Sequence, residues 1–267
     1  MSVTRIAIHG AAGRMGQRLV ALGSADRDLK VVAALDSPHH PRFGQDAGVL
    51  AGVGELGLPL TDKVARQVDV VIDFSSPEGA VGILETCLTQ RLALVLATTG
   101  LESNQQARVR EAAACIPLLW APSMSLAVNL AMKLSADAAS ALKDHASGAD
   151  VEIIERHHRY KEDSPSGTAL RFGEIIADRM GQRDQRHGRQ GRVGARPHGE
   201  IGYHAVRVGD NPGEHTIIFG LLGETLEITV RATNRDCYAH GALAAAKFLA
   251  GKPAGLYGMN DVLGIGE

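Results

Sequence analysis

A glycine-rich turn near the start of the chain restricts the possible folds more strongly than any other segment. Residues 3–8 read as a buried strand, and Gly10-Ala11-Ala12-Gly13-Arg14-Met15-Gly16 then leads into a helical stretch at 17–22. Glycines at this spacing allow a tight turn, and the free amides at a helix start attract a pyrophosphate. The pattern predicts a dinucleotide-binding strand–turn–helix in which residues 10–15 contact the cofactor; the alternative is a plain tight turn.

An acidic residue follows the second predicted strand, residues 30–35. Asp36 lies 20 residues after Gly16, which is the spacing of the carboxylate that binds the ribose hydroxyls of NAD. A carboxylate at this position repels the 2′-phosphate of NADP, and no arginine follows directly, although residues 39–42 could still reach a phosphate. We therefore expect NADH or NADPH as cofactor, with a preference for NADH; the alternative for Asp36 is a turn residue.

Apolar strands alternate with helices over the first part of the chain. Strands are expected at 68–74, 92–97 and 116–120, with helices between them. This alternation predicts a Rossmann-type doubly wound parallel sheet, and we place its domain at residues 1–125. Ligands gather at the carboxyl ends of such strands, so Thr98 and Thr99 are candidate cofactor contacts, unless they are only turn residues.

Residues 126–235 predict a second domain of different architecture. A long helix at 126–144 is followed by strands joined mostly by short turns, which are expected at 150–155, 201–208, 214–221 and 225–232. The overall class is therefore α/β, with a second α+β domain built on a mostly antiparallel or mixed four-stranded sheet.

Two features of this domain suggest contacts outside it. Ile217 and Phe219 are expected to place apolar side chains on the uncovered face of the sheet, where self-association would bury them. Residues 181–200 are rich in arginine and glycine and predict a mobile loop. That loop is either solvated or a contact for a neighbouring subunit or an anionic ligand.

The most polar stretch of the second domain lies between a strand and an amphipathic helix. His157, His158 and Lys161 come first, and Ser164-Pro165-Ser166-Gly167-Thr168 then opens the helix. Amides at a helix start favour an anion, glycine allows close approach, and histidine exchanges protons near neutral pH. The stretch predicts a site for a small dicarboxylate; the alternative is a solvated, charged loop.

The composition narrows the class of protein. A formal net charge of −2 argues against a nucleic-acid or membrane-surface protein, and no apolar run is long enough to span a bilayer. Three widely spaced cysteines suggest a reducing compartment without disulfides or a metal site. We therefore expect a cytoplasmic protein with a small-molecule substrate and no metal.

Residues 155–169 resemble the signature of the dihydrodipicolinate reductase family, E-x-H-H-x-x-K-x-D-x-P-S-G-T-A, and match it at every fixed position. The resemblance implies NAD(P)H-dependent reduction of 4-hydroxy-tetrahydrodipicolinate to tetrahydrodipicolinate in diaminopimelate and lysine biosynthesis. It implies that His157 and Lys161 are catalytic, with transfer of protons as their role. It also implies a homotetramer and a set of substrate-binding residues: His158, Gly167 and Thr168.

The resemblance also covers the nucleotide-binding half and the C-terminus. Ala97-Thr98-Thr99 corresponds to a G-T-T-G cofactor loop, with alanine in place of the first glycine. A further cofactor segment corresponds to Ala121, Pro122, Ser123 and Met124, where the family has asparagine at the position of Ser123. The family has glycine at the position of Ala127, and its C-terminal helix and tail, here 236–267, pack back on the first domain.

Two other functions remain open at this stage. The same fold serves NAD-dependent amino-acid dehydrogenases acting on aspartate or homoserine, but the polar stretch at 157–168 argues against that chemistry. A non-catalytic NAD(H)-binding protein is the other alternative, and the serine at position 123 is the one feature that favours it.

Overall fold

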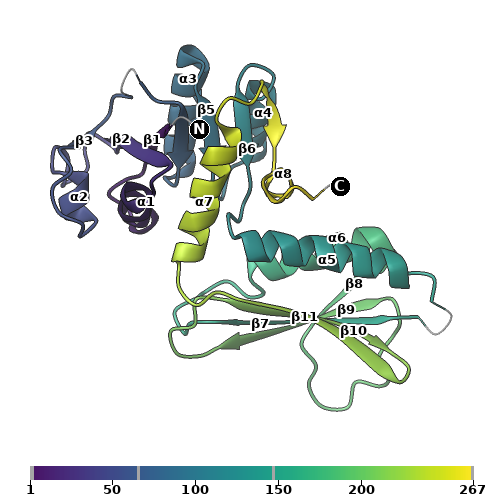
Figure 1. Cartoon of the computed structure of the whole chain (residues 1–267). Helices are drawn as coiled ribbons and strands as arrows, with labels where there is room; N and C mark the ends of the chain where they lie inside the picture. Colours follow the sequence, from purple (N-terminus) through teal and green to yellow (C-terminus); the bar gives the residue numbers. More distant parts are fainter. Residues whose placement is uncertain (1–2, 65–66, 146–147, 266–267) are drawn as a thin grey trace. The chain divides into compact units, whose positions relative to one another are not determined.

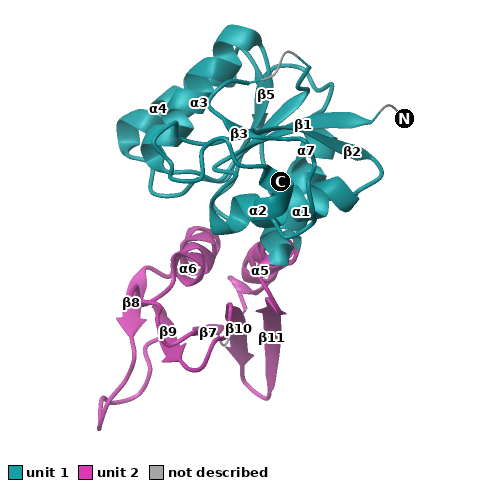
Figure 2. Cartoon of the chain, turned by 90° about the vertical axis from the view of Figure 1, so that its left-hand side faces the viewer, with its two compact units in different colours: residues 1–126, 236–267 teal, residues 127–235 magenta. Residues whose placement is uncertain are grey.

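The computed structural model describes residues 3–64, 67–145 and 148–265. The chain divides into two compact units, Met1–Leu126 with Asp236–Glu267, and Ala127–Arg235 (Figure 2). The domain ranges expected from the sequence begin at residue 1 and end at residue 267. Their outermost residues, 1–2 and 266–267, lie outside the described part.

The first unit is built on a seven-stranded sheet in the order β12-β6-β5-β4-β1-β2-β3, and all of its strand pairs are parallel (Figure 1). The strands are β1 (Thr4–His9), β2 (Leu29–Leu35), β3 (Leu60–Thr61), β4 (Val70–Asp73), β5 (Ala93–Leu96), β6 (Pro117–Trp120) and β12 (Gly255–Tyr257). The predicted doubly wound parallel sheet is confirmed. The sequence pattern missed the short strands β3 and β12, which have too few residues to show a period.

Helices cover both faces of this sheet, which explains why its strands are apolar throughout. They are α1 (Arg14–Ala25), α2 (Ala47–Leu50), α3 (Pro77–Gln90), α4 (Ser103–Ala112), α7 (Asp236–Leu249) and α8 (Met259–Leu263). Ile6 and Ile8 of β1 pack in one core cluster with residues of α1 and α7. Ala7, between them, faces the other cluster with residues of α3 and α4.

One carboxylate organises the segment at 42–59, which the sequence predicts to be a loop. Asp46 caps the short helix α2 through the amides of Gly48 and Val49, at 2.9 and 3.1 Å. It also accepts hydrogen bonds from the amides of Leu56 and Leu58. These backbone hydrogen bonds, led by that of Leu56, lower the pKa of Asp46. The segment is therefore a closed turn around one acid rather than a loop without internal contacts.

The second unit is a mixed five-stranded sheet in the order β11-β10-β7-β9-β8, with helices on one face (Figure 1). Its elements are α5 (Leu126–Leu142), β7 (Asp150–His157), α6 (Gly167–Met180), β8 (Asp184–His187), β9 (Glu200–Arg207), β10 (Glu214–Leu221) and β11 (Glu224–Arg231). The α+β architecture is confirmed, with one strand more than expected. Both pairs that β9 makes, with β7 and with β8, are parallel, so the sheet is mixed.

The additional strand lies inside the basic segment 181–200. β8 is fully exposed along its length, which gives the sequence no apolar signal to detect. Two arginines of this segment, Arg189 and Arg196, also bind Glu152 of β7, at 2.7 and 2.9 Å. The prediction of a loop was therefore wrong for Asp184–His187, whereas residues 188–199 hold no helix or strand and are linked to the sheet by these ion pairs.

The expectation that Ile217 and Phe219 lie on an uncovered face of the sheet was also wrong. Ile217 and Phe219 are both 0% exposed and belong to the cluster that contains Phe172 and Ile176 of α6. They lie on the helix-covered face, so they give no reason for self-association. On the edge strand β11 the burial of the alternating apolar residues falls along the strand: Val230 is buried, Ile228 is partly buried and Leu226 is 43% exposed.

Candidate active site

The glycine turn of the first unit requires glycine at two of its positions. Gly10 has a φ of 76°, and a Cβ there would overlap the carbonyl oxygen of Phe74. A Cβ on Gly16 would overlap the carbonyl oxygen of Gly10, so helix α1 lies directly against the turn. Gly13 caps α1 without a side-chain hydrogen bond, which leaves amides at the helix start for an anion.

Asp36, the acidic residue that follows β2, is hydrogen-bonded to this glycine turn. Asp36 accepts a hydrogen bond from the amide of Ala12 at 2.8 Å and another from the amide of Ser37 at 2.8 Å. The carboxylate thus holds the end of β2 beside the glycine turn, and its side chain is only half-buried. A ribose placed here would meet both a carboxylate and the start of α1.

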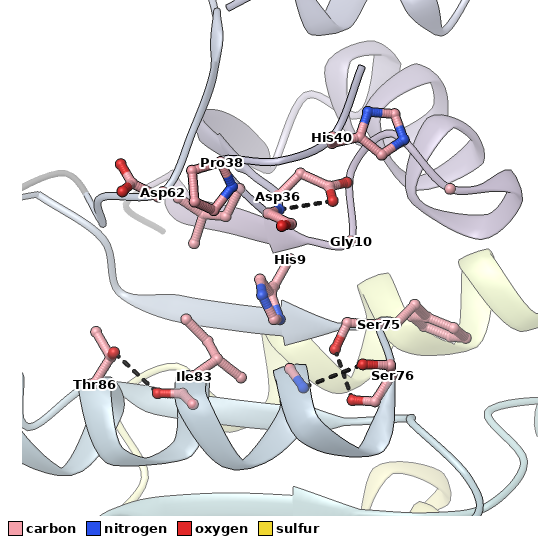
Figure 3. Close-up of a pocket in the computed structure, with 16 residues that line it drawn as sticks. His9, Gly10, Asp36, Pro38, His40, Asp62, Ser75, Ser76, Ile83 and Thr86 are labelled. Carbon is pink, nitrogen blue, oxygen red and sulfur yellow. Dashed lines mark hydrogen bonds between the residues drawn. The ribbon is translucent and has the colours of Figure 1, made fainter. Parts of the chain in front are cut away.

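A cavity of about 520 Å³ joins these residues (Figure 3). In Figure 3, Asp36, Pro38 and His40 lie on one side, residues of α3 lie on the other, and His9 lies between them. Its lining residues are His9, Gly10, Gly13, Leu35, Asp36, Ser37, Pro38, His40, Asp62, Phe74, Ser75, Ser76, Gly79, Gly82, Ile83 and Thr86. The structure therefore brings together Gly10, Gly13 and Asp36 around one cavity.

A buried acid that the sequence analysis did not single out lies beside this cavity. Asp73 is 0% exposed and accepts hydrogen bonds from Thr98 at 2.5 Å and Ser75 at 2.6 Å, and it also pairs with His9 at 2.6 Å. The signal that could have found it is an acid at the end of an otherwise apolar strand. The Thr98 hydroxyl is therefore used within the protein, and it also accepts the amide of Ser75.

The other predicted cofactor residues differ in their surroundings. Ala11, Ala12, Ala97, Ala121 and Met124 are buried, and Met124 belongs to the core. Met15 and Ser123 are half-buried, while Arg14, Thr99 and Pro122 are exposed. The residues after β5 and β6 line no part of the cavity described above. They stand at the same carboxyl edge of the sheet as Gly10, because β6, β5, β4 and β1 are parallel neighbours.

In the second unit, β7 ends at a predicted site residue, His157, which lies beside a buried carboxylate. Glu155 is 1% exposed, and one of its oxygens lies 2.6 Å from Nδ1 of His157. Burial opposes ionisation of Glu155, but hydrogen bonds from Arg207 and His157 outweigh it and keep the pKa of this carboxyl below its usual range. Burial in turn lowers the pKa of His157, against the effect of Glu155. The imidazole is therefore neutral at neutral pH.

The ionised carboxylate determines which histidine nitrogen carries the proton. Since Glu155 can only accept hydrogen bonds, Nδ1 of His157 must donate, and Nε2 keeps a free lone pair. His157 is thus arranged to take up a proton at Nε2 and to return it. The neighbouring His158 has a buried Nδ1 without a hydrogen-bond partner in the described part of the chain, so it can still bind a ligand.

Lys161 lies in the loop between β7 and α6. Its ammonium nitrogen is 2.8 Å from both carboxylate oxygens of Asp163, and its side chain is 21% exposed. The hydrogen bond from Lys161 lowers the pKa of Asp163. An exposed ion pair of this kind is weak and can be exchanged for the carboxylate of a ligand.

The start of α6 is capped and open to solvent. Ser166 accepts a hydrogen bond from the amide of Ala169 at 3.1 Å, and its own amide donates to Glu155 at 3.1 Å. Gly167 is exposed, and a Cβ built on it would have no heavy atom within 4 Å. The side of Gly167 on which a Cβ would stand is therefore open, at a helix start whose amides favour an anion.

A second histidine that the sequence analysis did not name supports this cap. His215 of β10 is 5% exposed, and its Nε2 lies 3.0 Å from the hydroxyl of Ser166. Its ring meets that of His157 edge-on, with centroids 5.2 Å apart. Burial lowers the pKa of His215 to about 4, so it stays neutral. No local sequence pattern connects position 215 with 166, which explains why it was missed.

Within residues 3–64, 67–145 and 148–265, no three His, Cys, Asp or Glu side chains are placed to hold a metal ion. Over the same residues, no helix is both long and apolar enough to cross a membrane.

Comparison with family models finds matches to both halves of the chain. The model described as "Dihydrodipicolinate reductase, N-terminus" matches residues 4–124. The model described as "Dihydrodipicolinate reductase, C-terminus" matches residues 127–263. Together they account for the glycine turn, Asp36 and the whole stretch from Glu155 to Thr168.

Individual relatives extend over the full length. The 4-hydroxy-tetrahydrodipicolinate reductase of Rhodopirellula baltica is 55% identical, with 98% of this chain and 96% of the relative covered. That of Alkalilimnicola ehrlichii is 49% identical, with 98% and 99% covered. A solved structure, the dipicolinate-bound dihydrodipicolinate reductase from Paenisporosarcina sp., has a TM-score of 0.78 at 25% identity. That similarity covers 97% of this chain and 99% of the other.

Proposed function

The chain belongs to the dihydrodipicolinate reductase family, and from this premise we propose how its residues divide the work of the reaction. The family's activity is the NAD(P)H-dependent reduction of 4-hydroxy-tetrahydrodipicolinate in diaminopimelate and lysine biosynthesis. The first unit binds the dinucleotide, and the second binds the dicarboxylate. The observation that carries this assignment is the open start of α6 beside Lys161, His158 and a neutral His157.

The residues around the cavity fit a dinucleotide. Gly10 and Gly13 leave the backbone bare where a pyrophosphate approaches the start of α1, and Asp36 offers an acceptor to a ribose. Residues Ala97 to Thr99 and Ala121 to Met124 would hold the rest of the cofactor from the carboxyl ends of β5 and β6. A reduced nicotinamide, when bound, supplies the hydride.

We expect NADH to be preferred over NADPH, because Asp36 and Asp62 both line the cavity and repel a 2′-phosphate. Asp36→Asn should raise KM for NADH about 10- to 100-fold, the effect of weakening hydrogen bonds to a charged group, and should reduce the discrimination against NADPH. Initial rates with each cofactor measure both changes. A wild-type protein with higher kcat/KM for NADPH would contradict this preference.

The substrate is proposed to bind at the start of α6. One carboxylate would take the amides of Gly167 and Thr168, and the other would take Lys161 and His158. The pairing of Lys161 with Asp163 supports this arrangement, since a substrate carboxylate can replace that exposed partner. The site thus neutralises a doubly negative ring and fixes its position, which contributes much of the rate.

Gly167→Ala tests this position without a folding defect. The new methyl group meets nothing in the protein, and alanine suits the first turn of a helix better than glycine, so the melting temperature should stay the same or rise. The methyl group would stand where the carboxylate approaches. We expect KM for the dicarboxylate and Ki for dipicolinate to rise at least about tenfold, with KM for NADH unchanged. Unaltered dipicolinate binding would contradict the proposed position.

Proton transfer falls to two residues. Nε2 of His157 is the free basic atom, held by the bond from Nδ1 to Glu155, and it can accept or return a proton. The Lys161 ammonium is proposed as the donor of the proton that accompanies reduction. His157 ends strand β7, and Lys161 lies in the loop that leads from β7 to α6. We propose that a ring held at the start of α6 lies near both.

The direct test is oxidation of NADH with freshly made product of dihydrodipicolinate synthase, followed by its absorbance. Turnover with that product and inhibition by dipicolinate are expected. Activity with aspartate or homoserine instead would favour the dehydrogenase alternative, and cofactor binding without any turnover would favour a non-catalytic protein. Neither alternative is supported by the relatives found.

The homotetramer and the cytoplasmic location also remain predictions. With Ile217 and Phe219 in the core, the support for self-association shifts to the edge strand β11 and its exposed Leu226. An unpaired edge with exposed apolar residues is a surface that proteins usually cover.

A further inference from the structure

Glu155 and Arg207 form an ion pair beneath the proposed dicarboxylate site. The guanidinium donates from two nitrogens to the two carboxylate oxygens, at 2.7 and 2.8 Å. Glu155 is 1% exposed, whereas the Arg207 side chain is 21% exposed. Arg207 ends strand β9 and lies 52 residues from its partner in the sequence. Neither residue itself donates or accepts a proton in the transfers proposed above, although Glu155 holds Nδ1 of His157.

The remaining bonds of Glu155 all lead to the site. Its Oε2 accepts from Nδ1 of His157 and its Oε1 accepts from the amide of Ser166, the cap of α6. One carboxylate therefore sets both the orientation of the imidazole and the position of the helix start. All four of its hydrogen bonds come from donors, which only an ionised carboxylate can satisfy.

Two further bonds of Arg207 lead to the same loop, while a third goes to the carbonyl oxygen of its neighbour Val206 at 2.9 Å. The guanidinium donates to the carbonyl oxygen of Lys161 at 3.2 Å and to that of Asp163 at 2.6 Å. These bonds hold the backbone on both sides of residue 162, between the two histidines and the cap. The loop that carries Lys161 is thereby attached to the sheet through one side chain.

We propose that Glu155 and Arg207 act together as a positioning pair that fixes His157, Lys161 and the start of α6 relative to one another. The proposal rests on the proposed roles of His157 and Lys161. It makes Arg207 a determinant of turnover, although it contacts neither proton-transferring atom.

The same strand supplies a matched control on its other face. Glu152 also lies in β7, accepts hydrogen bonds from Arg189 and Arg196, and pairs with Nε2 of His204 at 2.7 Å. Burial opposes its ionisation, but these partners lower its pKa to about 2. Glu152, like Glu155, thus binds arginine and histidine side chains, here two arginines and one histidine, yet none of them belongs to the proposed site.

The first test compares Glu155→Gln with Glu152→Gln. A glutamine at position 155 has an NH2 group where the glutamate has one of its two oxygens. This group cannot accept a hydrogen bond, so His157 and Ser166 cannot both keep donating to residue 155. We expect kcat to fall about 10- to 100-fold in Glu155→Gln, with KM for NADH unchanged, and no comparable fall in Glu152→Gln. Equal losses in both variants, scaling with their melting temperatures, would show a merely structural role and overturn the proposal.

The pH profile provides a readout that a structural role would not move. The charged and titratable groups that face His157 are Glu155, Arg207, Lys161 and His215. Removing the negative charge of Glu155 leaves the positive ones, which disfavour the imidazolium, so its pKa should fall further. The acid limb of kcat against pH should therefore move to lower pH in Glu155→Gln and stay in place in Glu152→Gln. An unmoved limb in Glu155→Gln counts against the proposal.

Arg207→Lys separates charge from geometry. Lysine keeps the positive charge next to Glu155. Its single nitrogen cannot donate to both carboxylate oxygens and also to the carbonyl oxygens of Lys161 and Asp163. We expect a lower kcat and a higher KM for the dicarboxylate, with the fold retained by circular dichroism. Wild-type kinetics in Arg207→Lys would refute the arginine's part. Full turnover in His157→Ala would refute the proposed proton-transfer role of His157 itself. That outcome differs from one in which His157→Ala loses turnover but Arg207→Lys does not, which would refute only the positioning pair.

Discussion

Replacement of Lys161 by alanine is expected to lower kcat by about 10²- to 10⁴-fold, the range for loss of a positioned proton donor. The ammonium lies 2.8 Å from Asp163, in the loop that leads from β7 to α6. Its removal takes away both the proposed proton donor and one charge that binds the dicarboxylate. KM for the dicarboxylate should therefore rise as well, whereas the affinity for NADH should not change. Steady-state rates with both substrates varied measure these effects.

Lys133 provides the control for this change. It pairs with Asp137 at 2.7 Å, and its side chain is 23% exposed, close to the 21% of Lys161. Lys133→Ala therefore removes an equivalent exposed ion pair of the same unit. Exposed pairs of this kind contribute little to stability, so neither variant should unfold. A loss of kcat in Lys133→Ala as large as that in Lys161→Ala would assign the effect to the fold, and near-normal turnover of Lys161→Ala would remove the proposed donor.

Replacement of His157 by alanine is the second change for which we expect a loss of about 10²- to 10⁴-fold in kcat. In the wild type, burial holds the pKa of His157 below the ordinary histidine value. The neutral form, with Nε2 free, is present above that pKa and is lost as the pH falls through it. The acid limb of kcat should therefore lie below the ordinary histidine pKa in the wild type and should vanish in His157→Ala.

His204 is the matching control for the histidine. It bonds to a glutamate of the same strand, Glu152, at 2.7 Å, as His157 bonds to Glu155 at 2.6 Å. It lies on the opposite face of the sheet, away from the start of α6. His204→Ala should keep both kcat and the acid limb. If the limb persists in His157→Ala, another group is responsible for it, and the assignment of His157 is wrong.

Both proposed binding sites use the start of a helix, but the two starts differ. Helix α1 begins after Gly13, which has no side chain to cap it, so its amides stay available to a pyrophosphate. Helix α6 begins after Ser166, whose side chain takes the amide of Ala169, while the amides of Gly167 and Thr168 remain for a carboxylate. The two helix starts suit the ligands proposed for them, which are an extended diphosphate at α1 and a compact carboxylate at α6.

Local sequence patterns predicted the regular elements that have a clear period. Apolar runs such as 68–74 and 92–97 corresponded to the buried strands β4 and β5, and the stretch before α6 carried the family signature. Patterns failed where strands are short or wholly exposed, as in β12 and β8. They also failed for the second face of the sheet in the second unit, because alternation shows that two faces exist but not which of them the helices cover.

The amino-acid sequence alone determined the parallel α/β sheet, the glycine turn with Asp36 and the polar stretch from His157 to Thr168, since each depends on residues close together in the chain. Only the tertiary structure decided which groups hold that stretch in place. Arg207 and His215 reach it from strands β9 and β10, and Asp73 collects His9, Ser75 and Thr98 from three segments. The physical reason is that a buried charge needs several partners at once, and folding brings them together from positions that no local period connects.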